Sequence, residues 1–250
     1  MVGTLRLVTL NVWCGKLFDE LIGFVKEEAY STDVFCFQEV LDNKEGVPSA
    51  VFKDGREDIV TQFRRALPDF YAYSSIPQTN ERGLATFVKN SWKVEDIKEE
   101  YVFGGKNTMS DNKWSTIGIN MLYTRISAGG EQFNIWNLHG KFVAPDKKDY
   151  PETLEQSRKI SNIIAPIAGK RILCGDFNLD PDTESIRILE RIPLRNLIKE
   201  YKIKSTRTRY YDLPAQFADY IMPSEEVRVS DFGVINKVVS DHLPLYVKCY

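Results

Sequence analysis

Polar side chains of a few kinds recur where the most apolar segments of this sequence end. These side chains are Asn11, Glu39, His139, Asp176 and Asn178, and Asp241 and His242 stand just before the last such segment. They offer carboxylate oxygens, amides and imidazoles, and no serine or cysteine nucleophile motif accompanies them. Hard divalent cations prefer oxygen ligands, and a bound cation can polarise a phosphoryl oxygen. The residue types therefore favour metal-assisted chemistry on a phosphoryl group.

The two histidines of the chain, His139 and His242, both fall in these segments. A histidine with a purely structural role would be free to lie anywhere. Binding and catalytic residues collect on short loops at the ends of strands, because a rigid sheet positions such loops well. We therefore expect both imidazoles to belong to one site at a sheet edge.

The elements that must position these residues mix strands with helices. Alternating or continuously apolar patterns predict strands at residues 5–12, 34–40, 84–88, 92–103, 116–126, 132–138, 171–174, 217–222, 227–234 and 243–249. Helical spacing predicts helices at 17–30, 58–67 and 151–167, and one capped by Asp182 or Thr183 that runs to Leu189. Gly129 and Gly130 predict a hairpin turn. Mixed sheets covered by helices on their outer faces would give an α/β sandwich, although periodicity alone leaves the layering open.

Length and charge limit the class of protein. A chain of 250 residues is long enough for one large domain, so we expect a single domain over residues 1–250. The net charge is −2, whereas non-specific nucleic-acid binders are usually basic. A polyanionic substrate would therefore need a local basic patch or a metal ion, and a small phosphorylated substrate fits equally well.

The cysteines and the apolar runs bear on location. The four cysteines form no CxxC pair, which favours reduced core residues and a cytoplasmic protein over a disulfide framework or a zinc site. No apolar stretch approaches the length of a transmembrane helix, and no secretory signal is evident. We expect a monomer.

Six short segments carry the polar residues in a fixed order along nearly the whole chain. They are residues 9–12 (TLNV), 37–40 (FQEV), 137–140 (NLHG), 175–178 (GDFN), 218–221 (ADYI) and 240–244 (SDHLP). Together they resemble the signature of the endonuclease/exonuclease/phosphatase superfamily, the group built around the deoxyribonuclease fold. One such match is modest evidence, but six in order are hard to produce by chance.

The resemblance implies a fold and a cofactor. The fold would be a four-layer α/β/β/α sandwich, with two packed mixed β-sheets and the site at one edge. Glu39 resembles the main carboxylate ligand of a Mg²⁺ ion, Asn11 would support that site, and Asp241 resembles a residue near the metal. Mg²⁺ keeps several waters, so one carboxylate with weaker helpers is sufficient. Mn²⁺ is expected to substitute for it.

The resemblance also implies catalytic roles. Asp176 and Asn178 resemble the pair that orients the attacking water and holds a phosphoryl oxygen, and His139 resembles a stabiliser of the phosphoryl oxygens. Asp219 resembles the carboxylate partner of His242, which would fix the imidazole tautomer. His242 could be the general base or a cationic stabiliser of the transition state, and these roles need different protonation states. The reaction would be in-line attack of water on phosphorus.

Substrate recognition must come from the loops, because the same core serves many phosphate esters. Arg207 and Arg209 stand beside tyrosines and could bind a phosphate while a base stacks. Trp114 belongs to a second candidate loop, and Lys147 to a third, at residues 141–152. The alternative for Arg207 and Arg209 is a solvated loop with its tyrosines packed inward.

Several functions therefore stay open. We expect hydrolysis of a phosphodiester, in a nucleic acid or nucleotide. The alternatives are a phosphomonoesterase, a tyrosyl-DNA phosphodiesterase, and a non-catalytic binder of a phosphorylated partner. A non-catalytic relative would be expected to lack at least one of Glu39, Asp176 and His242, and all three are present.

Overall fold

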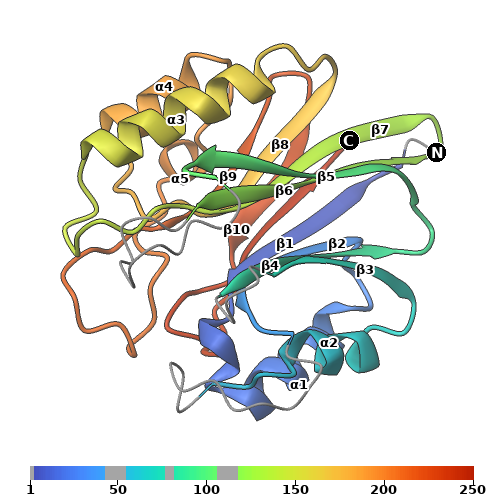
Figure 1. Ribbon diagram of the computed structural model, residues 1–250. Coiled ribbons are helices and arrows are strands. Elements are labelled where there is room, and N and C mark those ends of the chain that lie inside the picture. The colour runs from blue at the N-terminus through green and yellow to red at the C-terminus, as the bar shows by residue number, and fades with distance from the viewer. Residues whose placement is uncertain (1–2, 43–54, 77–81, 106–117) are drawn as a thin grey trace.

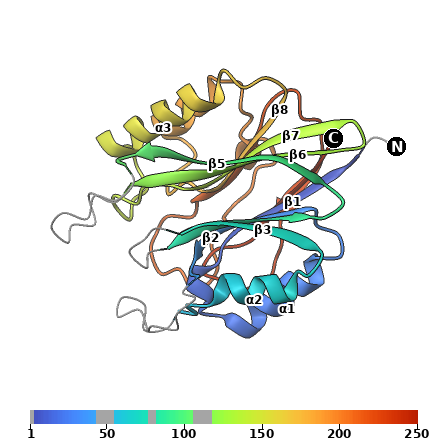
Figure 2. The ribbon, with the colours of Figure 1, turned by 45° about the vertical axis from the view of Figure 1, so that its right-hand side comes forward.

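Two β-sheets pack face to face and helices cover the outer face of each, so the chain forms the predicted four-layer α/β/β/α sandwich (Figure 1). The structure is a computed structural model that describes residues 3–42, 55–76, 82–105 and 118–250. A view turned by 45° separates the two sheets and their helical layers (Figure 2).

The first sheet has six strands and places the N-terminal strand at its centre. Their spatial order is β10 (Val229–Val234), β11 (Leu245–Cys249), β1 (Leu5–Asn11), β2 (Val34–Val40), β4 (Gly83–Lys89) and β3 (Phe70–Ser75). Strands β1 and β2 are parallel and the other neighbours are antiparallel. Helices α1 (Phe18–Glu28) and α2 (Ile59–Ala66) cover its outer face.

The second sheet has five strands. Their order is β5 (Lys93–Phe103), β6 (Ile119–Ala128), β7 (Glu131–His139), β8 (Lys170–Asp176) and β9 (Asp219–Pro223). Strands β7 and β8 are parallel. Helices α3 (Pro151–Ile164) and α4 (Glu184–Glu190) cover its outer face, and the short α5 (Leu197–Glu200) packs against β9.

The alternation of side chains along β1 explains how one strand serves two layers. Leu5 and Leu7 belong to the apolar cluster shared with the second sheet, whereas Val8 and Leu10 belong to the cluster shared with α1 and α2. Successive side chains of a strand point to opposite faces. The same alternation carries Asn11 onto the face between the sheets, where its amide meets Asp176 of β8.

Most elements lie where the sequence predicts them, and β3 is the main one it misses. β3 lies at the edge of its sheet and its residues are mostly half-buried, so it lacks the alternation that identifies a strand with one buried face. The hairpin between β6 and β7 turns at Gly129 and Gly130, both with positive φ. Thr183 is the cap of α4, because its side chain accepts a hydrogen bond from the Ile186 N–H.

Within the described ranges, no helix combines the length and the apolar character that crossing a membrane requires. The four cysteines are all buried as free thiols.

Candidate active site

The strand ends bring the polar residues together at one edge of the sandwich. Strands β1, β7 and β8 end there with Asn11, His139 and Asp176, and Glu39 is the last residue but one of β2. The antiparallel β9 begins there with Asp219. In the second sheet His139 pairs with Asp176, and Asp176 pairs with Asp219, so these three residues form a row across neighbouring strands.

A bulge in β2 aims the carboxylate of Glu39. Gln38 pairs with Leu84 of β4 and Val40 pairs with Gly83, so Glu39 is an extra residue, and it has a φ of 56°. Bulges commonly redirect a side chain beside a site. This bulge places Glu39 Oε1 at 3.7 Å from Nε2 of His139, which belongs to the other sheet.

Gly83, which pairs with Val40 beside this bulge, has no room for a side chain. A Cβ at Gly83 would lie 2.5 Å from the carbonyl oxygen of Ser75. Strand β4 can therefore begin beside the end of β3 only with glycine there.

The loop after β8 arranges Asp176 and Asn178. The Asn178 N–H donates to Asp176 Oδ1 at 2.8 Å, and the Asn178 side-chain amide donates to the Gly140 carbonyl at 2.9 Å. Asn178 has a φ of 56°, an uncommon conformation that is typical of functional sites. Gly140 and Gly175 allow this packing, since a Cβ on either would come within 2.5 Å of a backbone oxygen.

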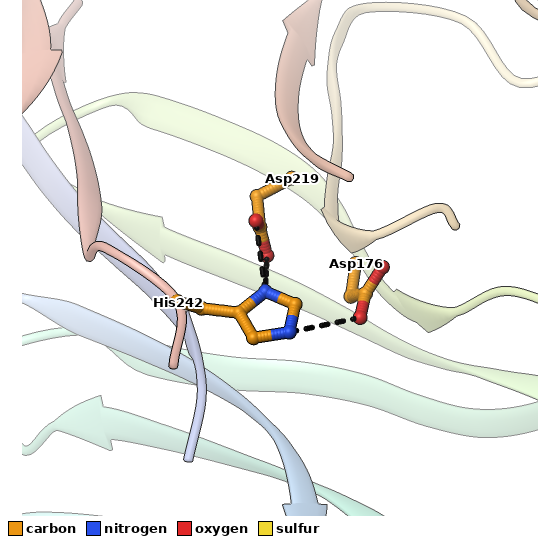
Figure 3. Close-up of side chains that lie close together, drawn as sticks. All are labelled: Asp176, Asp219 and His242. Carbon is orange, nitrogen blue, oxygen red and sulfur yellow. Dashed lines mark hydrogen bonds and ion pairs between the residues drawn. The ribbon is translucent and has the colours of Figure 1, made fainter. Parts of the chain in front are cut away.

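Asp219 orients the imidazole of His242, and Figure 3 shows the ring between two carboxylates. Nδ1 lies 2.8 and 2.9 Å from the two Asp219 oxygens, and Nε2 lies 3.6 Å from Asp176 Oδ2. Burial lowers the pKa of His242, but the charge of Asp219, with that of Asp176, raises the pKa above its usual value. The pair has the geometry of a carboxylate–histidine dyad.

The pKa of the second histidine, His139, shifts in the opposite direction to that of His242. Nε2 of His139 lies 3.7 Å from Glu39 Oε1 and 3.8 Å from Asp176 Oδ2. Burial lowers the pKa of His139, and the attraction of Asp176 and Glu39 does not fully offset it. The site therefore favours a neutral His139 and a more basic His242.

Charged neighbours keep the two central carboxylates ionised. Burial raises the pKa of Asp176, but the charges of His242 and Lys147 outweigh that effect and hold the pKa well below its usual range. Burial also raises the pKa of Glu39, and Arg82 is the main group that brings it below its usual value. Asp241 is different, because burial and the charge of Glu39 raise its pKa.

Two sets of side chains could hold a divalent cation. Asp176, Asp219 and His242 have ligand atoms that all lie within 4.8 Å of one another. His242 Nδ1 and Asp219 already bind each other there, however. Around Glu39, the Asn11 amide donates a hydrogen bond that stabilises the ionised carboxylate, while its oxygen accepts from the Trp13 N–H at 3.0 Å. Asp241 is close enough to repel Glu39, so the carboxylate oxygens of Glu39 and Asp241 would be the main oxygen ligands of this set. Oxygen donors suit Mg²⁺, and a cation would relieve this repulsion between carboxylates.

The three predicted substrate residues have different outcomes. Arg207 is buried, and its Nη1 donates to Nε2 of His242 and lies 3.8 Å from Asp241 Oδ2. Arg209 is exposed, and its guanidinium lies over the Tyr210 ring rather than among the carboxylates. Trp114 lies outside the described residues.

Three residues of the site were not singled out as site residues from the sequence. Arg82 places Nη1 2.6 Å from Glu39 Oε1, and Lys147 donates to Asn178 Oδ1. Cys14 directs its thiol to Glu39 at 3.6 Å, and burial together with Glu39 raises its pKa to about 12, so the thiol stays neutral. Two of them had a weaker sequence signal: Arg82 directly precedes the strand that begins at Gly83, and Lys147 is a cation of the candidate loop at residues 141–152.

The segment between β7 and α3 is attached to the helical layer by Asp149. Its carboxylate accepts hydrogen bonds from the N–H groups of Glu184 and Ser185, the first residues of α4. Such groups have no partner within their own helix. Burial raises the pKa of Asp149, but the hydrogen bonds from Ser185 and Glu184 bring it below its usual value.

We expect Asp149→Ala to lower the free energy of unfolding at neutral pH by about 1 kcal/mol, as for loss of a helix cap. Because the folded pKa is the lower one, this contribution is full above the unfolded pKa of about 4 and is lost as the pH falls through the folded pKa. Urea unfolding at neutral and acidic pH would measure it, with the exposed Asp182→Ala as control. Equal stability of variant and wild type at neutral pH would contradict it.

Comparison with known proteins agrees with this architecture. A model of the endonuclease/exonuclease/phosphatase family matches residues 8–242. A search of curated proteins finds no match.

Solved structures with this fold cover nearly the whole chain. A family protein from Bacteroides thetaiotaomicron has a TM-score of 0.77 and 15% identity, covering 99% of this chain and 95% of that one. A mannosyl-6-phosphatase from Bacteroides thetaiotaomicron has a TM-score of 0.75 and 15% identity, covering 98% and 99%. The catalytic domain of human nocturnin with a bound sulfate has a TM-score of 0.67 and 17% identity, covering 99% and 94%.

Proposed function

Because this chain belongs to the endonuclease/exonuclease/phosphatase family, we propose that it is a Mg²⁺-dependent phosphoesterase that hydrolyses a phosphodiester in a nucleic acid or nucleotide. The observation that carries this proposal is the position of the His242 imidazole between the carboxylates of Asp219 and Asp176. An imidazole fixed at Nδ1 by one carboxylate turns Nε2 towards a second one, 3.6 Å away. That arrangement suits a water molecule that must be held and deprotonated.

In the proposed reaction, Asp176 orients a water molecule for in-line attack on phosphorus. The new P–O bond forms as the bond to the leaving alcohol breaks. The water proton passes to Nε2 of His242, which Arg207 Nη1 must release first. Asp219 stabilises the resulting imidazolium through Nδ1. The leaving oxygen takes up a proton from solvent and the imidazolium returns its proton to solvent, so the products are a phosphate monoester and an alcohol.

Neighbouring side chains hold the phosphoryl group. Asn178 and a neutral His139 would donate to its non-bridging oxygens, and Arg207 would add a cation beside His242. Fixed donors of this kind lower the barrier because they need no reorganisation during the reaction.

Glu39, Asn11 and Asp241 would hold the Mg²⁺ ion, with Mn²⁺ able to replace it. When bound, the ion neutralises charge that develops on the phosphoryl oxygens. The ionised state of Glu39 and the oxygen donors around it support this assignment. The non-catalytic alternative is disfavoured because Glu39, Asp176 and His242 are all present and meet at one edge.

A phosphomonoesterase is the second candidate, and the cations at the site favour it. Arg82, Lys147 and Arg207 all reach the catalytic edge. A monoester carries more negative charge than a diester, so it gains more from such cations. The fold shared with a mannosyl-6-phosphatase is consistent with this alternative.

The deciding experiment compares bis(p-nitrophenyl) phosphate, a diester, with p-nitrophenyl phosphate, a monoester. Both are assayed with Mg²⁺, with Mn²⁺ and with EDTA, and the His242→Ala variant serves as the inactive control. Cleavage of the diester with either metal and its loss in EDTA is the expected result. Preference for the monoester would favour the second candidate, and cleavage that is equal in EDTA would contradict the metal requirement.

The localisation and assembly that fit this proposal are a cytoplasmic monomer. Four buried thiols are compatible with a reducing compartment. Light scattering of the purified protein would test the monomer.

A further inference from the structure

The ammonium group of Lys147 is buried at the centre of the site. Its residue is 3% exposed, although lysine is almost never fully buried unless it is paired. Lys147 lies in the segment between β7 and α3, and its Nζ donates to Asn178 Oδ1. Nζ also lies 4.4 Å from the centre of the Phe142 ring.

These contacts do not provide an acceptor for every N–H donor of the Lys147 ammonium group. An ammonium has three N–H donors, and the neutral Asn178 oxygen takes one of them. Among the residues that the structure describes, no carboxylate lies within ion-pairing distance of Nζ, although Asp176 attracts it from farther away. A buried charge without a charged partner is costly. The position therefore suits an anionic oxygen that arrives with a ligand.

The surrounding contacts hold Lys147 in place. Its carbonyl accepts a hydrogen bond from the Asp180 N–H at 2.8 Å, which joins it to the loop after Asn178. At the start of the segment, the Lys141 N–H donates to Gln156 of α3 at 2.8 Å. Near the end of the segment, the Asp149 carboxylate accepts a hydrogen bond from the Glu184 N–H at the start of α4. The ammonium is therefore preorganised, which is what stabilisation of a transition state requires.

We propose that Lys147 is a catalytic residue that binds a non-bridging oxygen of the substrate phosphoryl group, on the side of Asn178. The ligand class is a phosphate ester or its product, and inorganic phosphate is the simplest probe. The inference rests on the proposed function for its catalytic part, whereas the binding part can be measured without turnover. If Lys147 only held Asn178 in place, Lys147→Gln, which keeps a donor for Asn178, would retain phosphate affinity; loss of affinity in that variant requires the charge itself.

The first experiment is steady-state hydrolysis of the preferred p-nitrophenyl ester by Lys147→Met. Loss of one donor to the phosphoryl oxygens is expected to lower kcat by about 100-fold. Lys147→Arg should recover part of this loss, because it restores the charge with a different geometry. The exposed neighbour Lys148 provides the matched control, and Lys148→Met should keep the wild-type rate.

The second experiment is calorimetric titration of metal-free protein with inorganic phosphate. Wild type and Lys148→Met are expected to bind phosphate with equal affinity, and Lys147→Met at least about 10-fold more weakly, as for loss of one charge-assisted hydrogen bond. Wild-type phosphate affinity in a folded Lys147→Met variant would overturn the proposal. If that variant does not fold, Lys147→Gln, which keeps a donor for Asn178, takes its place.

The two proposals fail separately. A wild-type protein that cleaves no ester but whose phosphate affinity depends on Lys147 would contradict the proposed function and support the binding site. An active enzyme whose Lys147→Met variant keeps both full kcat and wild-type phosphate affinity would do the reverse.

Discussion

Asp176→Asn is expected to lower kcat by about 10³-fold with little change in KM, a loss typical of removing a group that activates water. Asp176 accepts hydrogen bonds from the Asn11 amide at 3.0 Å and from the Asn178 N–H at 2.8 Å. An asparagine has the same shape but no charge, and its NH₂ group would face one of these donors. The variant would neither orient the attacking water nor stabilise a cationic His242.

The assay is diester hydrolysis at saturating Mg²⁺, accompanied by thermal unfolding to show that the variant is folded. Asp182→Asn is the matched control, since the side chain of Asp182 is 81% exposed. Wild-type turnover in Asp176→Asn would contradict the proposed mechanism.

Glu39→Gln is expected to raise the Mg²⁺ concentration for half-maximal activity by at least about 100-fold, above the effect of typical outer-shell changes. The bulge in β2 gives Glu39 its position. Burial raises the pKa of its carboxyl group, but the charge of Arg82 brings the pKa below its usual value, so Glu39 stays ionised. Glutamine keeps the volume and removes the charge that holds the cation. Excess Mg²⁺ should restore activity only in part.

Calorimetric binding of Mn²⁺ gives a readout that does not depend on turnover, and Glu20→Gln on exposed α1 surface is the control. Unchanged metal affinity in Glu39→Gln would remove Glu39 from the metal site. The cation would then belong to the cluster of Asp176, Asp219 and His242, whose ligand atoms also lie close together.

Much of the fold is encoded locally. Period-two alternation in β1 separates the residues that face the second sheet from those that face the helices, and this pattern can be counted from the sequence. Strand β3 could not be identified in this way, because an edge strand that is half-buried on both faces has no apolar face to mark it.

The candidate site was predictable where residues follow strands directly, as Asp176 and Asn178 do. The parallel pairs β1–β2 and β7–β8 end at the same edge, so polar residues at their carboxyl ends must converge. The sequence also identified Arg207 and Arg209 together, and the structure separates them: Arg207 turns inward to His242 and Arg209 outward over Tyr210.

By itself the sequence indicated the family and the set of polar residues at the strand ends, because residue type and period are local properties of the chain. The four layers were predicted only through the resemblance to that family. Only the tertiary structure decided how those residues are aimed. Asn11 and Asp176 are 165 positions apart, and the contact between them depends on the packing of two sheets. The bulge at Glu39, and the burial of Lys147 beside Asn178, depend in the same way on neighbours distant in sequence, which no local pattern records.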